Sequence, residues 1–376
     1  MPNQDNIMIL EEKEGNFNSN INGQKNKKIC EGEDSQKNKK NEEQFKNLNY
    51  MNEYVINNGP SDLKKFIIEE YIGKGSESYV YKIRLKGTNK FFCLKVMKKI
   101  KRRINKSELS IAKQIKNNYL SIVLYYYADK NADYDYMIME LGCSNLSNFT
   151  RKILKRYTLS ETFLCLIAYQ VLQGLSYLHM CKIAHLDIKP QNIIITEYLD
   201  IKLIDFSVSL DYSQKKGQDI QLNIVGTPYY MSPEVIQEMR IKLKDLQKVD
   251  LFSLGVTLYV LGFGRLPFDI TPGLDENENN KELLRKMNSG WKVVNINNTF
   301  SEHFVNFLNG LLEIDINKRM NLEQALNSHF IKAAHLILNE KENTYNANSF
   351  LSHLITDHIR AYQEFVSNKS GNSNFF

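Results

Sequence analysis

The hydrophobic positions along the chain separate a polar beginning, a stretch of alternating apolar residues and a long remainder with apolar residues at helical spacing. Residues 1–62 are rich in Asn, Lys, Glu and Gln and poor in aromatic residues, so we expect a disordered extension. Residues 66–85 and 91–98 alternate and are rich in Ile, Tyr, Val and Phe, as β-strands are. With segments 121–128 and 134–141, which have the same character, they predict an antiparallel sheet of about five strands.

Helical spacing first appears over residues 105–116, where a short helix with one apolar face is expected. Thr158 and Glu161 form the pattern of a capping box ahead of a long amphipathic helix. A fully apolar helix is expected to begin at Asp250. A carboxylate at the start of such a helix is costly to bury without hydrogen-bond partners, so we expect it to hold backbone N–H groups of the neighbouring loop at residues 185–192.

The composition fits a soluble enzyme better than a membrane protein or a binding tail. With 376 residues, 42% hydrophobic and 24% charged, the chain can bury a large core and is long enough for two lobes. The net charge of +6 is mild, which argues against nucleic acid as the main partner. The apolar run at 251–264 is too short to span a bilayer, and the N-terminus lacks a secretion signal, so no membrane partner is expected. The 5 cysteines are odd in number and widely spaced, which indicates reduced thiols in the cytosol or the nucleus.

The candidate chemistry centres on residues 185–192, HLDIKPQN, which lie between an apolar helical run and a β-branched strand. Loops mounted on rigid elements in this way often carry catalytic groups. Asp187 could serve as a base for a hydroxyl, Lys189 as a cation beside a moving phosphoryl group, and Asn192 as a neutral oxygen ligand for magnesium. The three residue types at this spacing therefore favour phosphoryl transfer.

This segment resembles the catalytic loop of the eukaryotic protein kinases, H-R-D-x-x-x-x-N, with Leu186 where the family often has arginine. The resemblance extends over residues 66–331, and its motifs occur in the family's order. It implies an α+β, bilobal protein kinase fold. A small antiparallel β-sheet lobe with one main helix would cover residues 63–142 and a larger, mainly helical lobe residues 143–331. A helical tail at 332–376 could dock on the kinase lobe or on a partner, and the oligomeric state stays open.

In the resemblance, the smaller lobe supplies most of the site for ATP. The turn around Gly73 and Gly75 would let backbone amides approach phosphate oxygens, although alone it also fits an ordinary hairpin. Lys95 has the spacing of the lysine that holds the α- and β-phosphates, and Glu108 would pair with it. Cys93 would pack against adenine as a small hydrophobe. The residues expected to bind the nucleotide are Ile72, Gly73, Gly75, Val80, Cys93, Lys95, Glu108, Met139, Glu140 and Gly142.

The magnesium ligands in this resemblance are Asn192 and Asp205. An acid after a buried strand can also simply cap a turn, but its placement with Asn192 favours the metal. The family's D-F-G triplet appears here as Asp205, Phe206 and Ser207. Because serine lacks glycine's freedom at positive φ, we expect a restricted inactive flip of this segment.

Residues 226–234, GTPYYMSPE, resemble the substrate-binding end of a kinase activation segment. Thr227 together with Lys189 marks the serine/threonine branch of the family. Glu234 is expected to pair with Arg319. The arginine that Leu186 replaces binds an activation-segment phosphate in the family, so we expect activity without phosphorylation of this segment.

The resemblance implies a serine/threonine protein kinase that transfers the γ-phosphoryl group of magnesium ATP to protein hydroxyls. Ile224, Pro228 and Met231 would line an apolar pocket for the residue after the acceptor, and Gln191 makes a basic preference modest. Val208, with its stiff branch, would favour threonine as acceptor. Two alternatives remain. A nucleotide-binding pseudokinase scaffold draws support from Ser207, Leu186 and Ser78, and a dual-specificity kinase is the other.

Overall fold

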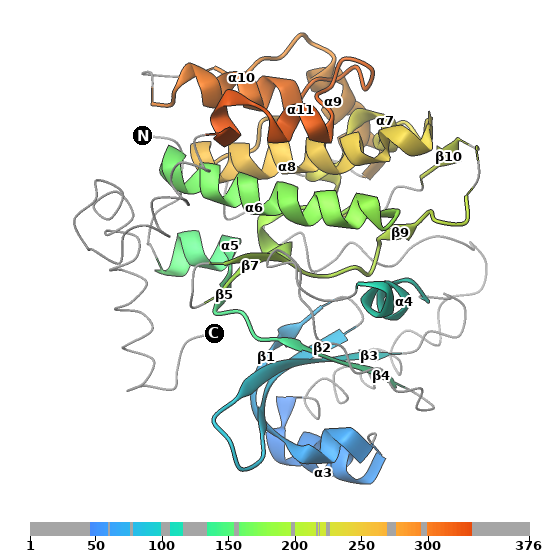
Figure 1. The fold of residues 1–376 in the computed structure, drawn as a ribbon, viewed down its shortest axis with the longest axis vertical. Helices are drawn as coiled ribbons and strands as arrows, with labels where there is room; N and C mark the ends of the chain where they lie inside the picture. The colour runs from blue at the N-terminus through green and yellow to red at the C-terminus, as the bar shows by residue number, and fades with distance from the viewer. Residues whose placement is uncertain are drawn as a thin grey trace. The chain divides into compact units, whose positions relative to one another are not determined.

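The computed structural model describes residues 46–58, 61–75, 78–98, 106–115, 134–153, 158–196, 200–215, 217, 219–222, 226–268, 276–294 and 299–332. They fall into two compact units. Of the described residues, 46–98 and 134–141 belong to the first unit, and 106–115 and 142–332 to the second. The expected α+β class is confirmed, because the first unit is built on an antiparallel sheet and the second is mainly helical (Figure 1).

The first unit contains four antiparallel strands in the order β1-β2-β3-β4. The fifth strand expected at residues 121–128 lies outside the described residues. A short 3-10 helix, η1 (Ser61–Lys65), leads directly into the sheet. The strands are β1 (Phe66–Lys74), β2 (Ser78–Leu85), β3 (Phe91–Lys98) and β4 (Tyr134–Glu140).

One face of this sheet forms the core of the first unit. The helix α3 (Leu48–Asn58) packs beside β1 and contributes Met51, which is fully buried with Leu63 of η1. Successive side chains of a strand point to opposite faces, so the buried residues of this core recur at every second position. From the strands they are Ile68, Tyr81, Ile83, Leu94, Val96, Tyr136 and Ile138.

Helix α3 corrects the expectation that residues 1–62 are disordered throughout. Its apolar residues Leu48 and Met51 share one helical face, which the Asn- and Lys-rich composition around them conceals. The side chain of Asn52 exchanges two hydrogen bonds with the backbone of Ile68, with Nδ2 donating to the carbonyl at 3.0 Å and Oδ1 accepting from the N–H at 2.9 Å. The folded unit therefore begins before the first strand.

The second unit is organised on two buried helices, α6 (Glu161–Met180) and α8 (Leu246–Phe263), which lie side by side. Gly255 of α8 lets α10 approach closely, since a Cβ there would lie 2.9 Å from Cβ of Leu311. Other helical elements of the second unit are α4 (Lys106–Gln114), α5 (Leu146–Asn148), the π-helical turn η2 (Phe149–Ile153), α7 (Pro233–Ile236), α9 (Glu276–Met287), α10 (Glu302–Leu311) and α11 (Leu322–Leu326).

Short strands in the second unit flank the loop that contains Asp187 and the segment that follows Asp205. One sheet has the order β5-β7-β8, one joins β6 to β9, and one joins β10 to β11. These strands are β5 (Ser144–Asn145), β6 (Ile183–Ala184), β7 (Ile193–Ile195), β8 (Ile201–Leu203), β9 (Leu210–Asp211), β10 (Ile220–Gln221) and β11 (Arg240–Ile241). The 3-10 turns between elements are η3 (Pro190–Asn192), η4 (Pro228–Tyr230) and η5 (Leu243–Asp245).

Three boundaries differ from those expected. The two units divide between Leu141 and Gly142, and α4 groups with the second unit, where it contacts β9, although the sequence places its helix with the sheet. Helix α8 begins at Leu246, so Asp250 lies inside it and does not begin it. Residues of the tail expected at 332–376 lie, except for the first, outside the described residues.

The capping box expected at Thr158 and Glu161 is wrong. Helix α6 begins at Glu161 with Ser160 at its N-cap, and no side chain caps it there. The carboxylate of Glu161 instead accepts the backbone N–H of Ser301 at 2.7 Å and also the Ser301 hydroxyl. This long-range contact takes the place of the local one.

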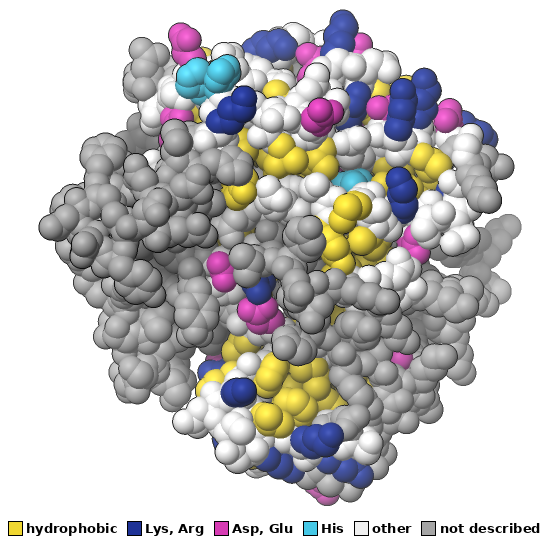
Figure 2. Space-filling model, viewed as in Figure 1, with side chains coloured by type: hydrophobic (Ala, Val, Ile, Leu, Met, Phe, Trp, Pro, Cys, Tyr) yellow, Lys and Arg dark blue, Asp and Glu magenta, His cyan; other side chains and the backbone are white. Residues whose placement is uncertain are grey.

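Among the described residues, two segments are long and apolar enough to cross a membrane by length and composition: α6 and the stretch Leu243–Phe263, which contains α8. The run at 251–264, expected to be too short to span a bilayer, is thus part of a longer helical stretch. Within the fold, 67% and 78% of these windows are buried against other elements. That burial is typical of core helices, for which the same length and hydropathy are common. On the face drawn in Figure 2, the described Lys and Arg side chains lie interspersed with Asp and Glu.

Candidate active site

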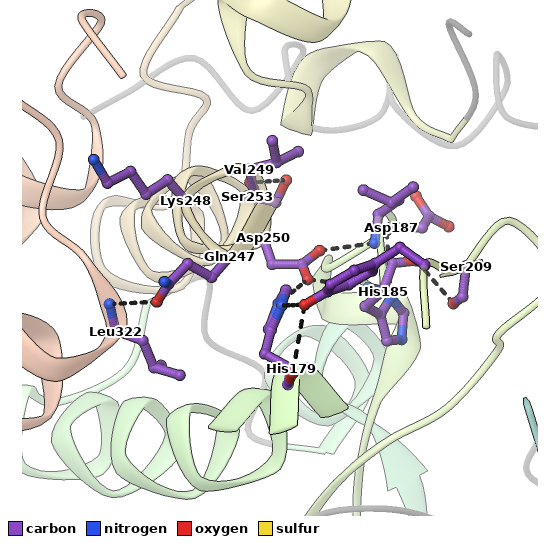
Figure 3. A network of polar contacts seen from close by, with 12 residues as sticks. His179, His185, Asp187, Ser209, Gln247, Lys248, Val249, Asp250, Ser253 and Leu322 are labelled. Atoms are coloured by element: carbon purple, nitrogen blue, oxygen red, sulfur yellow. Dashed lines mark hydrogen bonds and ion pairs between the residues drawn. The ribbon is translucent and has the colours of Figure 1, made fainter. Parts of the chain in front are cut away.

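The carboxylate of Asp250 fixes the backbone of the loop that precedes Asp187. The N–H of His185 donates to Oδ2 at 3.0 Å, and the N–H of Leu186 donates to Oδ1 at 2.7 Å (Figure 3). This contact confirms the role expected for the acid in the apolar helix. It also holds Leu186 at φ 66°, a left-handed conformation that costs a non-glycine residue about 1 kcal/mol.

Asp250 is fully buried, yet the pKa of its carboxyl group is lowered below its ordinary value. Burial would raise the pKa of its carboxyl group, but a hydrogen bond and charge from His179, the charge of His185 and the N–H of Leu186 together lower that pKa below its ordinary value. His179, in the last turn of α6, places Nε2 2.7 Å from Oδ2. A buried charge is thus satisfied on both oxygens.

The carboxylate of Asp187 is held from three sides. Nδ2 of Asn192 donates to Oδ2 at 2.7 Å, and Nζ of Lys189 lies 3.2 Å from the same oxygen. The N–H and the hydroxyl of Thr227 donate to Oδ1 at 3.2 and 3.3 Å. Lys189 also reaches the Thr227 hydroxyl at 2.5 Å. One acid, one cation and one hydroxyl therefore meet within the second unit.

Gly226 permits the approach of Thr227 to Asp187. Its φ is +100°, which L side chains rarely adopt, and a Cβ there would lie 3.1 Å from the Leu186 carbonyl and 3.2 Å from Oδ1 of Asp187. The sequence placed Gly226 in a motif but gave it no role. Any side chain at this position would strain the backbone and press on the candidate base.

Asn192 lies directly before β7, and Asp205 lies two residues after the end of β8. Ile193 of β7 pairs with Leu203 of β8, and the N–H of Ile204 donates to the Asn192 carbonyl at 3.0 Å. Asn192 uses its amide NH2 on the carbonyl and carboxylate of Asp187, so Oδ1 remains the acceptor of that side chain. Asp205, at φ 67°, follows directly after Ile204.

These two residues fit a magnesium ion, because an amide oxygen and a carboxylate are hard oxygen ligands. Among the described residues, no group of three or more His, Cys, Asp and Glu side chains gathers for a metal. A site of this kind would need oxygen atoms from phosphate groups to complete its coordination. Ser207 does not have a positive φ in this structure, so serine fits the conformation observed here.

The candidate nucleotide residues of the first unit line up across the sheet. Gly73 pairs with Val80, Val80 with Lys95, and Cys93 with Met139. Paired residues share a face, and so do residues two apart in a strand, so Val80, Cys93, Lys95 and Met139 lie on the face opposite the α3 core. The register therefore gathers four of the expected side chains, and Glu140 follows at the end of β4.

Cys93 behaves as the apolar residue that the sequence predicts. It is buried, and burial raises the pKa of its thiol to about 12, although the charge of Lys95 acts in the opposite direction. A thiol with that pKa is almost entirely protonated at neutral pH.

At Gly75 and Gly142, a side chain would collide with neighbouring atoms. The N–H of Gly75 donates to the Ser78 carbonyl at 2.8 Å, and a Cβ on Gly75 would lie 2.8 Å from the Ser78 hydroxyl oxygen. At Gly142, a Cβ would lie 2.7 Å from Cδ1 of Ile194 in β7. Ile72 and Gly73 lie within β1, which bulges between Tyr71 and Gly73.

The expected partner of Lys95 lies in the other unit. Glu108 belongs to α4 and is 5% exposed, and Lys95 in β3 is 9% exposed. Their pairing stays a prediction, as does the contribution of Gly142 to the same site.

Glu234 and Arg319 form the pair that the sequence predicts. Nη1 and Nη2 of Arg319 donate to the two carboxylate oxygens at 2.6 and 2.8 Å, and both side chains are buried. Arg319 also donates to the carbonyls of Glu313, Lys248 and Ile314. This pair fastens α7, which is separated from the end of η4 by two residues, to the turn before α11.

Sequence reasoning gave no role in holding this loop to three residues that surround it, although it names Ser209 and Tyr212 as hydroxyls that could carry a phosphate. His179 contacts Asp250, and its Nδ1 lies 3.2 Å from the Tyr212 hydroxyl. The Ser209 hydroxyl donates to the His185 carbonyl at 2.9 Å. The only available signal was a histidine near the end of an apolar helix, because the pairing of β6 with β9 that brings Tyr212 near is not visible in the pattern.

Comparison with known protein families gives a match over most of the chain. The family model described as "Protein kinase domain" matches residues 66–331. This is the same range over which the sequence motifs suggested the resemblance.

The chain is also similar to several curated serine/threonine kinases. It is 28% identical to "Serine/threonine-protein kinase dst2" of Dictyostelium discoideum over 85% of this chain and 26% of the relative. It is 29% identical to "Probable serine/threonine-protein kinase fhkD" of the same organism over 75% of this chain and 39% of the relative. It is 30% identical to human "Serine/threonine-protein kinase H2" over 72% and 69%. The chain thus spans well under half the length of the two Dictyostelium relatives.

Proposed function

Because the chain belongs to the protein kinase family, we propose that it is an active serine/threonine kinase that transfers the γ-phosphoryl group of ATP to protein hydroxyls. The observation that carries this proposal is that Lys189 and Thr227 both contact the carboxylate of Asp187 and also contact each other. A scaffold that only binds nucleotide has no need of that arrangement. The relatives described as serine/threonine kinases support the choice of acceptor.

Asp187 is placed to orient the acceptor hydroxyl and to take its proton. As the acceptor oxygen bonds to the γ-phosphorus, the bond from that phosphorus to the leaving oxygen of ADP breaks, and the hydroxyl proton passes to the carboxylate. Asn192 and Thr227 hold the carboxylate in one orientation. Lys189 stabilises negative charge that develops on the transferred group.

Asn192 and Asp205 would hold magnesium, which when bound neutralises phosphate charge. Lys95 would bind the nucleotide phosphates with support from Glu108, and the apolar face with Val80, Cys93 and Met139 would receive the base. Protein substrates, ATP and magnesium are thus the partners that we propose.

We also propose that activity does not depend on phosphorylation of the activation segment. Leu186 offers no charge to a phosphate. Of the hydroxyls that follow Asp205, Ser209 and Tyr212 are buried and hydrogen bonded, whereas Ser213 is exposed. The backbone of Leu186 is instead held directly by Asp250.

Purified full-length protein incubated with labelled ATP, magnesium and a generic protein substrate tests this function. We expect incorporation at serine or threonine, and a loss of at least about a hundredfold in Asp187→Asn with nucleotide affinity near that of the parent. Parent protein that binds nucleotide but transfers none would establish the pseudokinase alternative. Phosphotyrosine in the product would establish dual specificity. Turnover of Asp187→Asn within tenfold of the parent would reject the role of Asp187.

A further inference from the structure

We infer that the hydroxyl of Tyr212 is a positioning group for catalysis, acting through His179 and Asp250 on the backbone of the loop that carries Asp187. The inference rests on the proposed kinase activity and adds a residue to that site. Tyr212 does not touch the candidate base. Its influence would pass through two intervening side chains.

Tyr212 is fixed from both sides. It directly follows β9, whose Asp211 pairs with Ile183 of β6, and its own N–H donates to the Lys182 carbonyl at 2.9 Å. Its side chain is 7% exposed, and its ring lies 6.4 Å from that of His179. The hydroxyl oxygen therefore has a defined place, 3.2 Å from Nδ1 of His179 and 3.4 Å from the His179 carbonyl oxygen.

Each ring nitrogen of His179 has a partner, Asp250 at Nε2 and Tyr212 at Nδ1. A carboxylate only accepts hydrogen bonds, so Nε2, at 2.7 Å from Asp250, carries a hydrogen. The hydroxyl of Tyr212 faces the other ring nitrogen, Nδ1, and the hydrogen between them belongs to one or the other according to the protonation of the ring. Burial, and then the charge of Asp250, raises the pKa of Tyr212 to about 12, so the hydroxyl keeps its hydrogen at physiological pH.

The position of Asp250 depends on this ring. Figure 3 shows His179 reaching from its helix to Asp250, whose oxygens also receive the N–H groups of His185 and Leu186. Without the hydroxyl, the imidazole can rotate away, and one of the contacts that hold the carboxylate weakens. The loop would then sample more conformations, and Asp187 would spend less time in its productive orientation.

The segment around Tyr212 also contacts α4 and the loop of Asp187 within the second unit. Ser209 donates to the His185 carbonyl, and Asp211 accepts from Nε2 of Gln114 in α4 at 2.7 Å. Residues 209–212 thus link α4 and the loop of Asp187 through uncharged donors. This linkage uses no phosphate, in agreement with leucine at position 186.

The test compares Tyr212→Phe with Tyr259→Phe. Tyr259 lies in α8 and is 2% exposed, and its hydroxyl is hydrogen bonded to Arg265, so the control loses a similar group away from the loop. We expect Tyr212→Phe to lower kcat about threefold to tenfold, as the loss of one hydrogen bond predicts, with KM for ATP within about twofold of the parent. The control should keep its kcat. A kcat of Tyr212→Phe equal to that of the control would overturn the inference.

A second variant, His179→Gln, tests the route. Glutamine keeps an N–H donor near the position of Nε2 but has no nitrogen at the position of Nδ1. If Tyr212 acts through His179, adding Tyr212→Phe to His179→Gln lowers kcat no further. Independent, multiplying losses would show that Tyr212 acts by another route. Should His179→Gln fail to fold, the comparison of the two tyrosine variants still decides.

Amide hydrogen exchange of the peptide containing residues 185–189 gives a readout that needs no activity. We expect faster exchange there in Tyr212→Phe and not in Tyr259→Phe. If the parent transfers no phosphate but exchange still shows this difference, the proposed function fails while the positioning role stands. Unchanged exchange together with unchanged kcat rejects the positioning role alone.

Discussion

Arg319 binds Glu234 through both terminal nitrogens, at 2.6 and 2.8 Å, with the arginine 1% and the glutamate 4% exposed. Three backbone carbonyls take the remaining donors of the guanidinium. A buried charge pair of this kind stabilises a fold mainly because neither partner can be left alone. It ties the segment after Thr227 to the body of the second unit.

The first prediction concerns this pair. Arg319→Met should lower the free energy of unfolding by about 3 to 5 kcal/mol, because it leaves Glu234 buried without its partner. Denaturant titration followed by circular dichroism measures the change. Lys318→Met is the matched control, since Lys318 is next in the chain with a side chain 76% exposed. A loss below about 1 kcal/mol, as for an exposed ion pair, would contradict the prediction.

The second prediction concerns Ser232, where the resemblance to the family has alanine. Its side chain is fully buried, and its hydroxyl has no hydrogen-bond partner in the part of the chain that the structure describes. Ser232→Ala should therefore raise the free energy of unfolding by about 1 kcal/mol.

Ser253 provides the control for this prediction, because its buried hydroxyl donates to the Tyr230 carbonyl at 2.8 Å. Ser253→Ala should lower stability by a similar amount, about 1 kcal/mol. Thermal melts of the two variants would thus move in opposite directions. A destabilised Ser232→Ala would mean that its hydroxyl has a partner, such as a bound water.

The third prediction concerns Lys95. Lys95→Met should weaken productive ATP binding and catalysis together, because the lysine is expected to hold the phosphates. Steady-state kinetics at varied ATP measures both. Lys98→Met, an exposed lysine at the end of the same strand, should match the parent. An unchanged rate for Lys95→Met would show that another cation performs this role.

The fourth prediction concerns regulation. Complete dephosphorylation should change the rate little, since Leu186 cannot pair with an activation-segment phosphate. The measurement is activity before and after phosphatase treatment, with mass spectrometry to confirm removal. A large loss that is restored on rephosphorylation, for instance at Ser213, would show that a different cation binds that phosphate.

The fifth prediction concerns the acceptor. Val208 should favour threonine over serine by about 1 kcal/mol, the value of one buried methyl contact. Matched peptides that differ only in Ser or Thr, assayed with the parent and with Val208→Phe, measure the ratio. Serine as the better acceptor for the parent, or an unmoved ratio in the variant, would reject the assignment. Pro228 and Met231 lie in or beside η4, whereas Ile224 lies outside the described residues.

What the sequence predicts well is local. The strand register that unites Val80, Lys95 and Cys93 follows from alternation around one turn. Asp250 is found because an acid in an apolar helix requires a partner, although the start of the helix is misplaced by the polar residues Gln247 and Lys248 that precede it.

What the sequence predicts poorly depends on distant contacts. Glu161 matches a capping box, but its carboxylate binds Ser301, 140 residues away. Tyr212 and His179 are 33 residues apart and meet only because β6 pairs with β9. The hydrophobic pattern of these segments does not predict either contact.

The hydrogen bonds of Asn52 bear on whether the sheet of one molecule can pair with the sheet of another. Strand β1 is an end strand of the sheet as described, and an end strand offers its backbone to any passing strand. The amide of Asn52 occupies the N–H and carbonyl of Ile68 as a neighbouring strand would. Residues 48–58 lie outside the range of the family match, yet a chain that starts at residue 66 would expose this edge together with the apolar surface that Met51 covers. We predict that such a shortened chain self-associates through its sheet more readily than a chain that retains residues 48–58.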